Sequence, residues 1–147
     1  MSSGRARAAS LRLIAAFLER DGAAVEEILR GRDVAELADM LESLAGLATL
    51  TTQAMALAGA AGPVAEGATQ RRVVDLVSEV AGPVDGATAH LLWTAFAAGE
   101  ASEAMADVPA VAVQLMAACA AVTGEDWSGW PPAALARQYR ALADRTA

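Results

Sequence analysis

The chain has 147 residues, of which 55% are hydrophobic, and a formal net charge of −7. This length suits one domain with its own core, and the hydrophobic share excludes an intrinsically disordered chain. All 11 positive charges are arginine, against 18 acidic residues. Because a nucleic-acid-binding surface is normally basic, this balance argues against nucleic acid and favours a basic partner.

The composition predicts an all-α protein. Alanine, the best helix former, is the commonest residue, whereas aromatic residues make up only 4% of the chain. The single Cys119 excludes an intramolecular disulfide, so we expect a reducing, cytoplasmic compartment. Charged residues from Arg12 onward interrupt the apolar stretch after the N-terminal segment MSSGRARAAS, and we therefore expect no signal peptide.

The longest uncharged stretch, residues 43–65, has the length of a membrane span. However, Thr49, Thr51, Thr52 and Gln53 lie in its middle, glycine is frequent, and Pro63 ends it. Leucine is also too sparse for a confident span. We therefore predict a buried core helix here and no membrane association.

Three helices are expected in the first part of the chain. The first runs from about Ala6 to Arg20, and Asp21 caps a short second helix that stops at Gly31. Asp33 opens the third helix, with Glu36 three residues later as in a capping box. The apolar positions of the third helix predict a packing seam of Val34, Leu37, Leu41, Leu44 and Ala48.

A Gly/Ala/Pro-rich linker at 59–68 precedes five further helices. Thr69 caps a helix that ends at Gly82-Pro83, and Asp85 starts another that stops at Gly99. After a short helix near 102–106, Asp107 caps a longer one, which Gly124 closes. The segment EDWSGWPP then forms a turn, and Pro131-Pro132 lead into a last helix with the apolar residues Leu135, Tyr139 and Leu142.

These elements predict one domain over 1–147, a bundle of seven to eight helices. Residues of about 6–58 and 69–124 share a pattern of helix, short helix and long uncharged helix, followed by a C-terminal helix at about 131–145. An internal duplication and a chance likeness between Ala-rich helices explain this pattern equally well. If there is a duplication, the two long uncharged helices should form the central pair.

The segment from Leu11 to about Ala58 includes LRLIAAFLERDGAAVEEILRGRDVAELADMLESLAGLA. It resembles the small, uncharacterised, Ala-rich helical proteins that are common in high-GC actinobacteria. The resemblance covers about a third of the chain and contains no diagnostic motif. It implies a bacterial or phage origin and no particular activity.

Few residues suggest chemistry. His90 is the only histidine, so a metal site or general base that used it would need carboxylates as partners. We favour the alternative that His90 is an ordinary residue of its helix. Asp75 and Glu79 share one helical face but lack the further ligands of a metal bundle, and we expect them to be solvated. Cys119 is expected to be a small buried hydrophobe. We predict no catalytic residue, metal or cofactor.

Two other features suggest contacts. Trp127 and Trp130 lie three apart, either as anchors for a partner or as staples that hold the last helix on the bundle. Arg71 and Arg72 begin a helix and are either solvated or in contact with an anion or an acidic partner.

Three functions remain open at this point. The first is a non-enzymatic interaction module that self-associates or docks on a protein partner. The second is a small-molecule binder with an apolar pocket between the halves, lined by Trp93, Phe96, Phe17 and methionines. The third is a helical-bundle enzyme that uses His90.

Overall fold

The computed structural model of the chain describes residues 4–57, 66–85, 87–89 and 109–146. These ranges contain no strand and six α-helices, which are α1 (Gly4–Leu18), α2 (Gly22–Leu29), α3 (Val34–Leu57), α4 (Glu66–Ala81), α7 (Pro109–Ser128) and α8 (Pro132–Thr146). The all-α prediction is confirmed. No helix in this part of the chain has the length and apolar character to cross a membrane.

Aspartate caps begin the elements where the sequence predicts them. The Asp21 carboxylate accepts a hydrogen bond from the Ala24 amide at 3.1 Å, and the Asp33 carboxylate accepts one from the Glu36 amide at 2.8 Å. The Asp85 carboxylate accepts one from the Thr88 amide at 3.2 Å. Each bond satisfies an amide that has no partner inside its helix, so local sequence is enough to place these helix starts.

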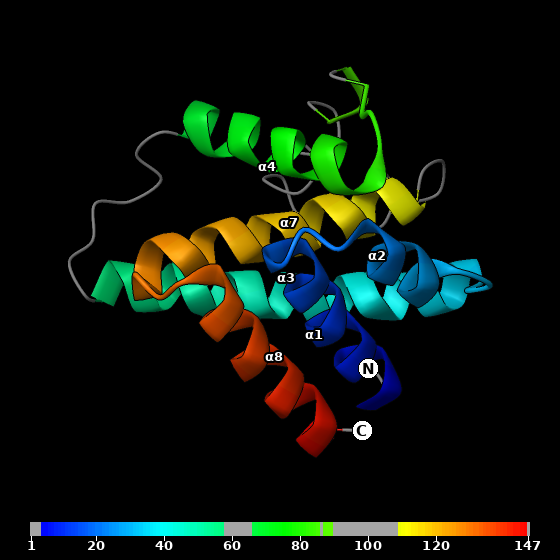
Figure 1. The fold of residues 1–147 in the computed structure, drawn as a ribbon, viewed down its shortest axis with the longest axis horizontal. Helices are drawn as coiled ribbons and strands as arrows, with labels where there is room; N and C mark the ends of the chain where they lie inside the picture. Colours follow the sequence, from blue (N-terminus) through cyan, green and yellow to red (C-terminus); the bar gives the residue numbers. More distant parts are fainter. Residues whose placement is uncertain (1–3, 58–65, 86, 90–108, 147) are drawn as a thin grey trace.

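The helices form layers around α1 and α7 (Figure 1). The long helices α3 and α7 pack side by side, α4 packs on α7, and α8 packs along α1. An ion pair joins Arg12 of α1 to Asp144 of α8 at 3.2 Å, and a second joins Glu19 to Arg140. These pairs show that α1 and α8 are antiparallel, so the start of α1 at Gly4 lies beside the end of α8 at Thr146 (Figure 1).

Among the side chains that the structure describes, those of α1 are the most enclosed. Every residue from Leu13 to Leu18 is at most 2% exposed, because α1 contacts α2, α3, α4, α7 and α8. Ser10 is buried too, and its hydroxyl donates to the carbonyls of Ala6 at 2.8 Å and of Met40 in α3 at 3.2 Å. The predicted contact between the long helices α3 and α7 is confirmed. Their place at the centre of the bundle stays a prediction, because the side chains of residues 48–57 lie outside the described part of the chain.

Two predicted helix limits are wrong. The helix assigned to Thr69 begins three residues earlier, at Glu66, where an acidic side chain suits the positive end of the helix dipole. The helix assigned to end at Gly124 continues to Ser128. A Cβ atom at Gly124 would lie 3.3 Å from both Leu135 and Tyr139, so this glycine makes room for α8. The turn is consequently confined to residues around Gly129, whose φ is +67°.

Two apolar residues assigned to buried faces are exposed. Val34, in the predicted seam of α3, is 61% exposed, and Leu142 of α8 is 41% exposed. The residues that bury α8 are the small Ala136 and Ala143, both fully buried. The close contact between α8 and α1 therefore depends on alanine. Hydrophobicity alone does not show which alanines of a helix are buried and which are exposed.

The predicted duplication stays a prediction. Much of its second half, including the segment 90–108 with Gly99 and the short helix near 102–106, lies outside the described residues.

Candidate functional site

One corner of the molecule carries most of the net charge. Seven carboxylates and two arginines lie between residues 21 and 42, a net charge of −5 out of the chain's −7. We call this surface of α2, the turn after it and the first half of α3 the acidic corner, with the carboxylates of Asp21, Glu26, Glu27, Asp33, Glu36, Asp39 and Glu42. All of these residues are exposed except Asp39, which is half-buried.

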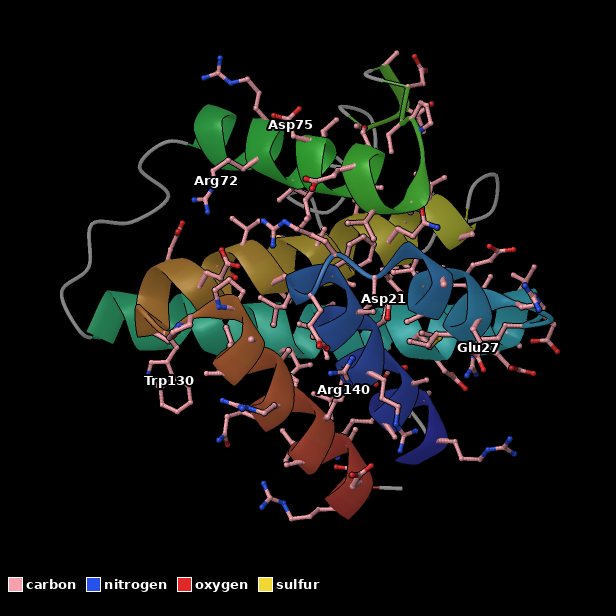
Figure 2. All side chains as sticks on the ribbon, viewed as in Figure 1. Asp21, Glu27, Arg72, Asp75, Trp130 and Arg140 are labelled. Carbon is pink, nitrogen blue, oxygen red and sulfur yellow. The ribbon has the colours of Figure 1, made fainter. Side chains whose placement is uncertain are left out.

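The two arginines of the acidic corner already have carboxylate partners. Arg30 pairs with Glu26 at 3.2 Å, and Arg32 pairs with Glu36 at 3.4 Å, each within one turn of helix. Among the described residues, Glu27 has no ion-pair partner, and its side chain lies at the α2 end of the molecule (Figure 2). The corner therefore keeps an excess of negative charge after its internal pairs have formed.

An apolar groove adjoins the acidic corner. It has a volume of about 490 Å³ and lies between α2, α4 and α7. Val25 is its buried apolar base, and the other lining residues are Gly22, Glu26, Leu29, Arg30, Val80, Ala81, Ala110 and Gln114. Since Leu29, Val80 and Ala110 are only half-buried, apolar surface remains open to solvent here. We call this feature the α2–α4–α7 groove.

A smaller polar hollow of about 180 Å³ lies where α4 meets the ends of α1 and α7. Arg72 points from α4 toward the end of α7 (Figure 2), where it pairs with Asp126 at 2.7 Å. Arg20 pairs with Glu79 at 3.8 Å. These contacts tie α4 to α7 and α1, so the acidic partner that Arg72 contacts belongs to the same chain. Asp75 is exposed, as predicted.

Among the predicted contact residues, the structure describes the side chains of Trp130, Arg71 and Arg72. Trp130 is 48% exposed at the turn between α7 and α8, so it does not act as a buried staple (Figure 2). Arg71 is exposed, whereas the side chain of Trp127 and the residues His90, Trp93 and Phe96 lie outside the described part of the chain. Phe17 is fully buried in the core and lines neither of the two hollows described above. The predicted ligand pocket stays a prediction, because Trp93 and Phe96 lie outside the described residues.

Cys119 is half-buried and packs against the core, whereas the sequence predicts a buried position. Burial among apolar neighbours raises the pKa of Cys119 to about 11, because the thiolate would lose its hydration. The thiol is therefore protonated at neutral pH. Burial also raises the pKa of Tyr139 above its ordinary value. Among the described residues, no group of three or more His, Cys, Asp or Glu side chains is placed to hold a metal ion.

Sequence reasoning missed the groove. Its apolar residues come from α2, α4 and the start of α7, far apart in the chain, and each looks like an ordinary core position. The acidic corner beside the groove could be recognised from the sequence, since its acidic residues lie close together between 21 and 42.

Comparison of the chain with family models, curated proteins and solved structures gives no match.

Proposed function

We propose that this protein is a docking module that binds a basic segment of a protein partner through the acidic corner. The observation that carries the proposal is the net charge of −5 over residues 21–42, which remains after both arginines of the corner have paired with carboxylates. Surfaces of opposite charge attract before contact and favour the correct partner over others.

The same charge argues against self-association through this surface. Two copies that met corner to corner would each bring an excess of carboxylates, and like charges that face each other at an interface are destabilising. A lysine- or arginine-bearing segment instead gains favourable contacts with Glu27 and its neighbours. Of the two modes that the sequence leaves open, self-association and docking on another protein, we therefore propose docking on another protein.

The test uses a synthetic helical peptide of leucine and lysine, about 14 residues or four turns long, labelled for fluorescence anisotropy. We expect it to bind the wild-type chain at low ionic strength. The affinity should fall as ionic strength rises from about 0.01 M to about 0.15 M, because the screening length then shortens from about 30 Å to about 8 Å. A peptide with glutamate in place of lysine should not bind.

A matched pair of charge reversals locates the binding surface. Glu27→Arg changes the acidic corner, whereas Asp75→Arg makes the same change on α4, in a different part of the molecule (Figure 2). We expect Glu27→Arg to weaken peptide binding about threefold or more, and Asp75→Arg to change it much less. Equal losses in the two variants would show a general charge effect and contradict the proposal, as would the absence of binding to the wild-type chain.

A further inference from the structure

The α2–α4–α7 groove is a space that the docking function proposed above does not use. Of the carboxylates of the acidic corner, only Glu26 lines it. The groove lies between α2, in the first half of the chain, and α4 and α7, which follow later. Its volume of about 490 Å³ is within the range of small-molecule sites, which is about 300–1,000 Å³.

Most of the lining of the groove is apolar. Val25 forms the base at 1% exposure, and the other apolar lining residues are Leu29, Val80, Ala81 and Ala110. Since none of these four is fully buried, water meets apolar surface on every side of the groove. An apolar molecule that displaced this water would gain free energy from the burial of both surfaces.

The walls of the groove are positioned before any ligand binds. A Cβ atom at Gly22 would lie 2.5 Å from the Val80 carbonyl oxygen, so the first turn of α2 lies directly against the last turn of α4. This backbone contact fixes α2 relative to α4. A site that keeps its shape in the free protein binds its ligand at a lower entropic cost.

The charged lining residues indicate an uncharged ligand. Glu26 and Arg30 are the only charged residues of the lining, and they pair with each other at 3.2 Å. The groove therefore offers no unpaired charge of either sign. A charged ligand would lose part of its hydration here without gaining an ion pair in return.

Gln114 provides a polar contact for the ligand. It lines the groove from α7, it is half-buried, and its side-chain amide makes no hydrogen bond to another described residue. An amide side chain both donates and accepts hydrogen bonds. It therefore suits one hydroxyl, carbonyl or amide group of a ligand, and pockets commonly orient an apolar ligand by a few polar groups of this kind.

We infer that the α2–α4–α7 groove binds an uncharged, mainly apolar small molecule with one hydrogen-bonding group, which pairs with the Gln114 amide. This site is separate from the docking function of the acidic corner. It also differs in its lining residues from the ligand pocket that the sequence predicts between the halves of the chain.

Three aromatic probes of similar size test the inference. Naphthol is uncharged and has a hydroxyl group, naphthalene lacks the hydroxyl group, and naphthoate is an anion at neutral pH. At about 0.15 M ionic strength, distant charges are screened beyond about 8 Å. We expect saturable binding of naphthol, about threefold or more tighter than naphthalene because of the hydrogen bond, and about tenfold tighter than naphthoate.

Nuclear magnetic resonance titration of the labelled chain gives these affinities and locates the site. The largest shifts on naphthol binding should occur at the lining residues, including the side-chain amide of Gln114. Saturable binding with its largest shifts elsewhere would overturn the inference, as would the absence of naphthol binding or equal affinity for naphthol and naphthoate.

A matched pair of variants tests occupation of the groove. Ala81→Phe fills it from its exposed rim and should weaken naphthol binding about tenfold or more. Ala141→Phe adds the same ring at an exposed position of α8, away from the groove, and should leave the affinity unchanged. Equal affinities in the two variants would contradict the assignment of the site.

Gln114→Leu keeps the test decisive if Ala81→Phe loses its cooperative thermal unfolding. Leucine has a similar size but no hydrogen-bonding group, so this variant should still bind naphthalene and should lose the preference for naphthol. Retention of the full preference would show that Gln114 does not contact the ligand, and would overturn the inference.

The remaining outcomes separate this site from the docking surface. Glu27→Arg should leave naphthol binding unchanged, and this result would support two independent sites. Displacement of naphthol by the leucine–lysine peptide would instead assign the groove to the partner segment. Dimers in light scattering that are lost in Ala81→Phe would assign it to a second copy, and either result overturns the inference. If naphthol binds as expected and the peptide does not, only the docking function fails.

Discussion

Arg20 has a backbone conformation that usually requires glycine. Its φ is +54°, and it follows α1 at a position where the Arg20 amide donates to the Phe17 carbonyl at 3.1 Å and the Asp21 amide donates to the Ala16 carbonyl at 2.9 Å. These two bonds form the Schellman arrangement that ends many helices. The Arg20 guanidinium compensates in part, because it donates to the Leu18 carbonyl at 3.1 Å and approaches Glu79.

Because of its positive φ, Arg20 should tolerate glycine better than alanine, which reverses the order of stability expected within a helix. Arg20→Gly should be more stable than Arg20→Ala by about 1 kcal/mol, because only glycine adopts this φ without a steric penalty. Arg7 is exposed within α1, and there glycine should be less stable than alanine by about 1 kcal/mol. Urea unfolding of the four variants measures both differences. An Arg20→Ala protein as stable as Arg20→Gly would contradict this account.

At the scale of elements, the position of α4 depends on a close backbone contact with α2. Gly22 faces the Val80 carbonyl, and the apolar residues Val73 and Val77 bury the inner face of α4 against α7. Ion pairs from Arg72 and Arg20 add links at the surface, and exposed pairs of this kind contribute at most about 1 kcal/mol each. The lack of a side chain at Gly22 and the burial of apolar residues of α4 therefore determine where α4 packs.

Two glycine-to-alanine substitutions should have opposite effects. Gly22→Ala should lower the free energy of unfolding by about 1–3 kcal/mol, because the new methyl group overlaps a backbone carbonyl that cannot move easily. Gly46→Ala, at an exposed position within α3 where a Cβ atom meets nothing within 4 Å, should raise it by about 0.5–1 kcal/mol. Chemical denaturation measures both, and an unchanged or stabilised Gly22→Ala protein would show that α2 and α4 do not meet at this contact.

At the scale of the whole molecule, the larger of the two core clusters among the described residues includes residues of every described helix. The main cluster of buried residues takes members from α1, α2, α3, α4, α7 and α8. Because α1 contacts the other five, its side chains link the layers seen in Figure 1. A core that is continuous in this way favours one cooperative unfolding transition.

Removal of Phe17, the largest fully buried side chain among the described residues, should therefore affect the whole molecule. Phe17→Ala should lower the free energy of unfolding by about 3–5 kcal/mol, since it leaves a cavity where α1 is most enclosed. Val34→Ala, at a position 61% exposed, should change it by less than about 0.5 kcal/mol. Circular dichroism and tryptophan fluorescence should report the same midpoint in each protein, and separate midpoints would show that the helices unfold in independent groups.

Features that depend on a few neighbouring residues were predictable. The caps at Asp21, Asp33 and Asp85 follow from a side chain and an amide three residues later. The glycines at Gly31 and Gly82 mark helix ends because both have positive φ. Gly124 has the same appearance in the sequence but lies inside α7, since its role is set by α8 and not by its chain neighbours.

The two parts of the candidate site also differ in whether the sequence predicts them. The acidic corner was predictable as an excess of charge, because its carboxylates are close in the sequence. The groove was not, because Val25, Val80 and Ala110 become neighbours only when α2, α4 and α7 pack. Likewise, the exposure of Trp130 depends on how α8 leaves α7, a direction that local residues do not determine.

The sequence by itself thus determined the all-α class, most helix starts and the acidic balance, since helix propensity, capping and charge depend on residues close together in the chain. Only the tertiary structure decided that α1 contacts every other described helix, that alanines bury α8, and that a groove lies between α2, α4 and α7. These features arise from the shapes of helices that meet across long sequence separations, where small residues set how closely the backbones approach.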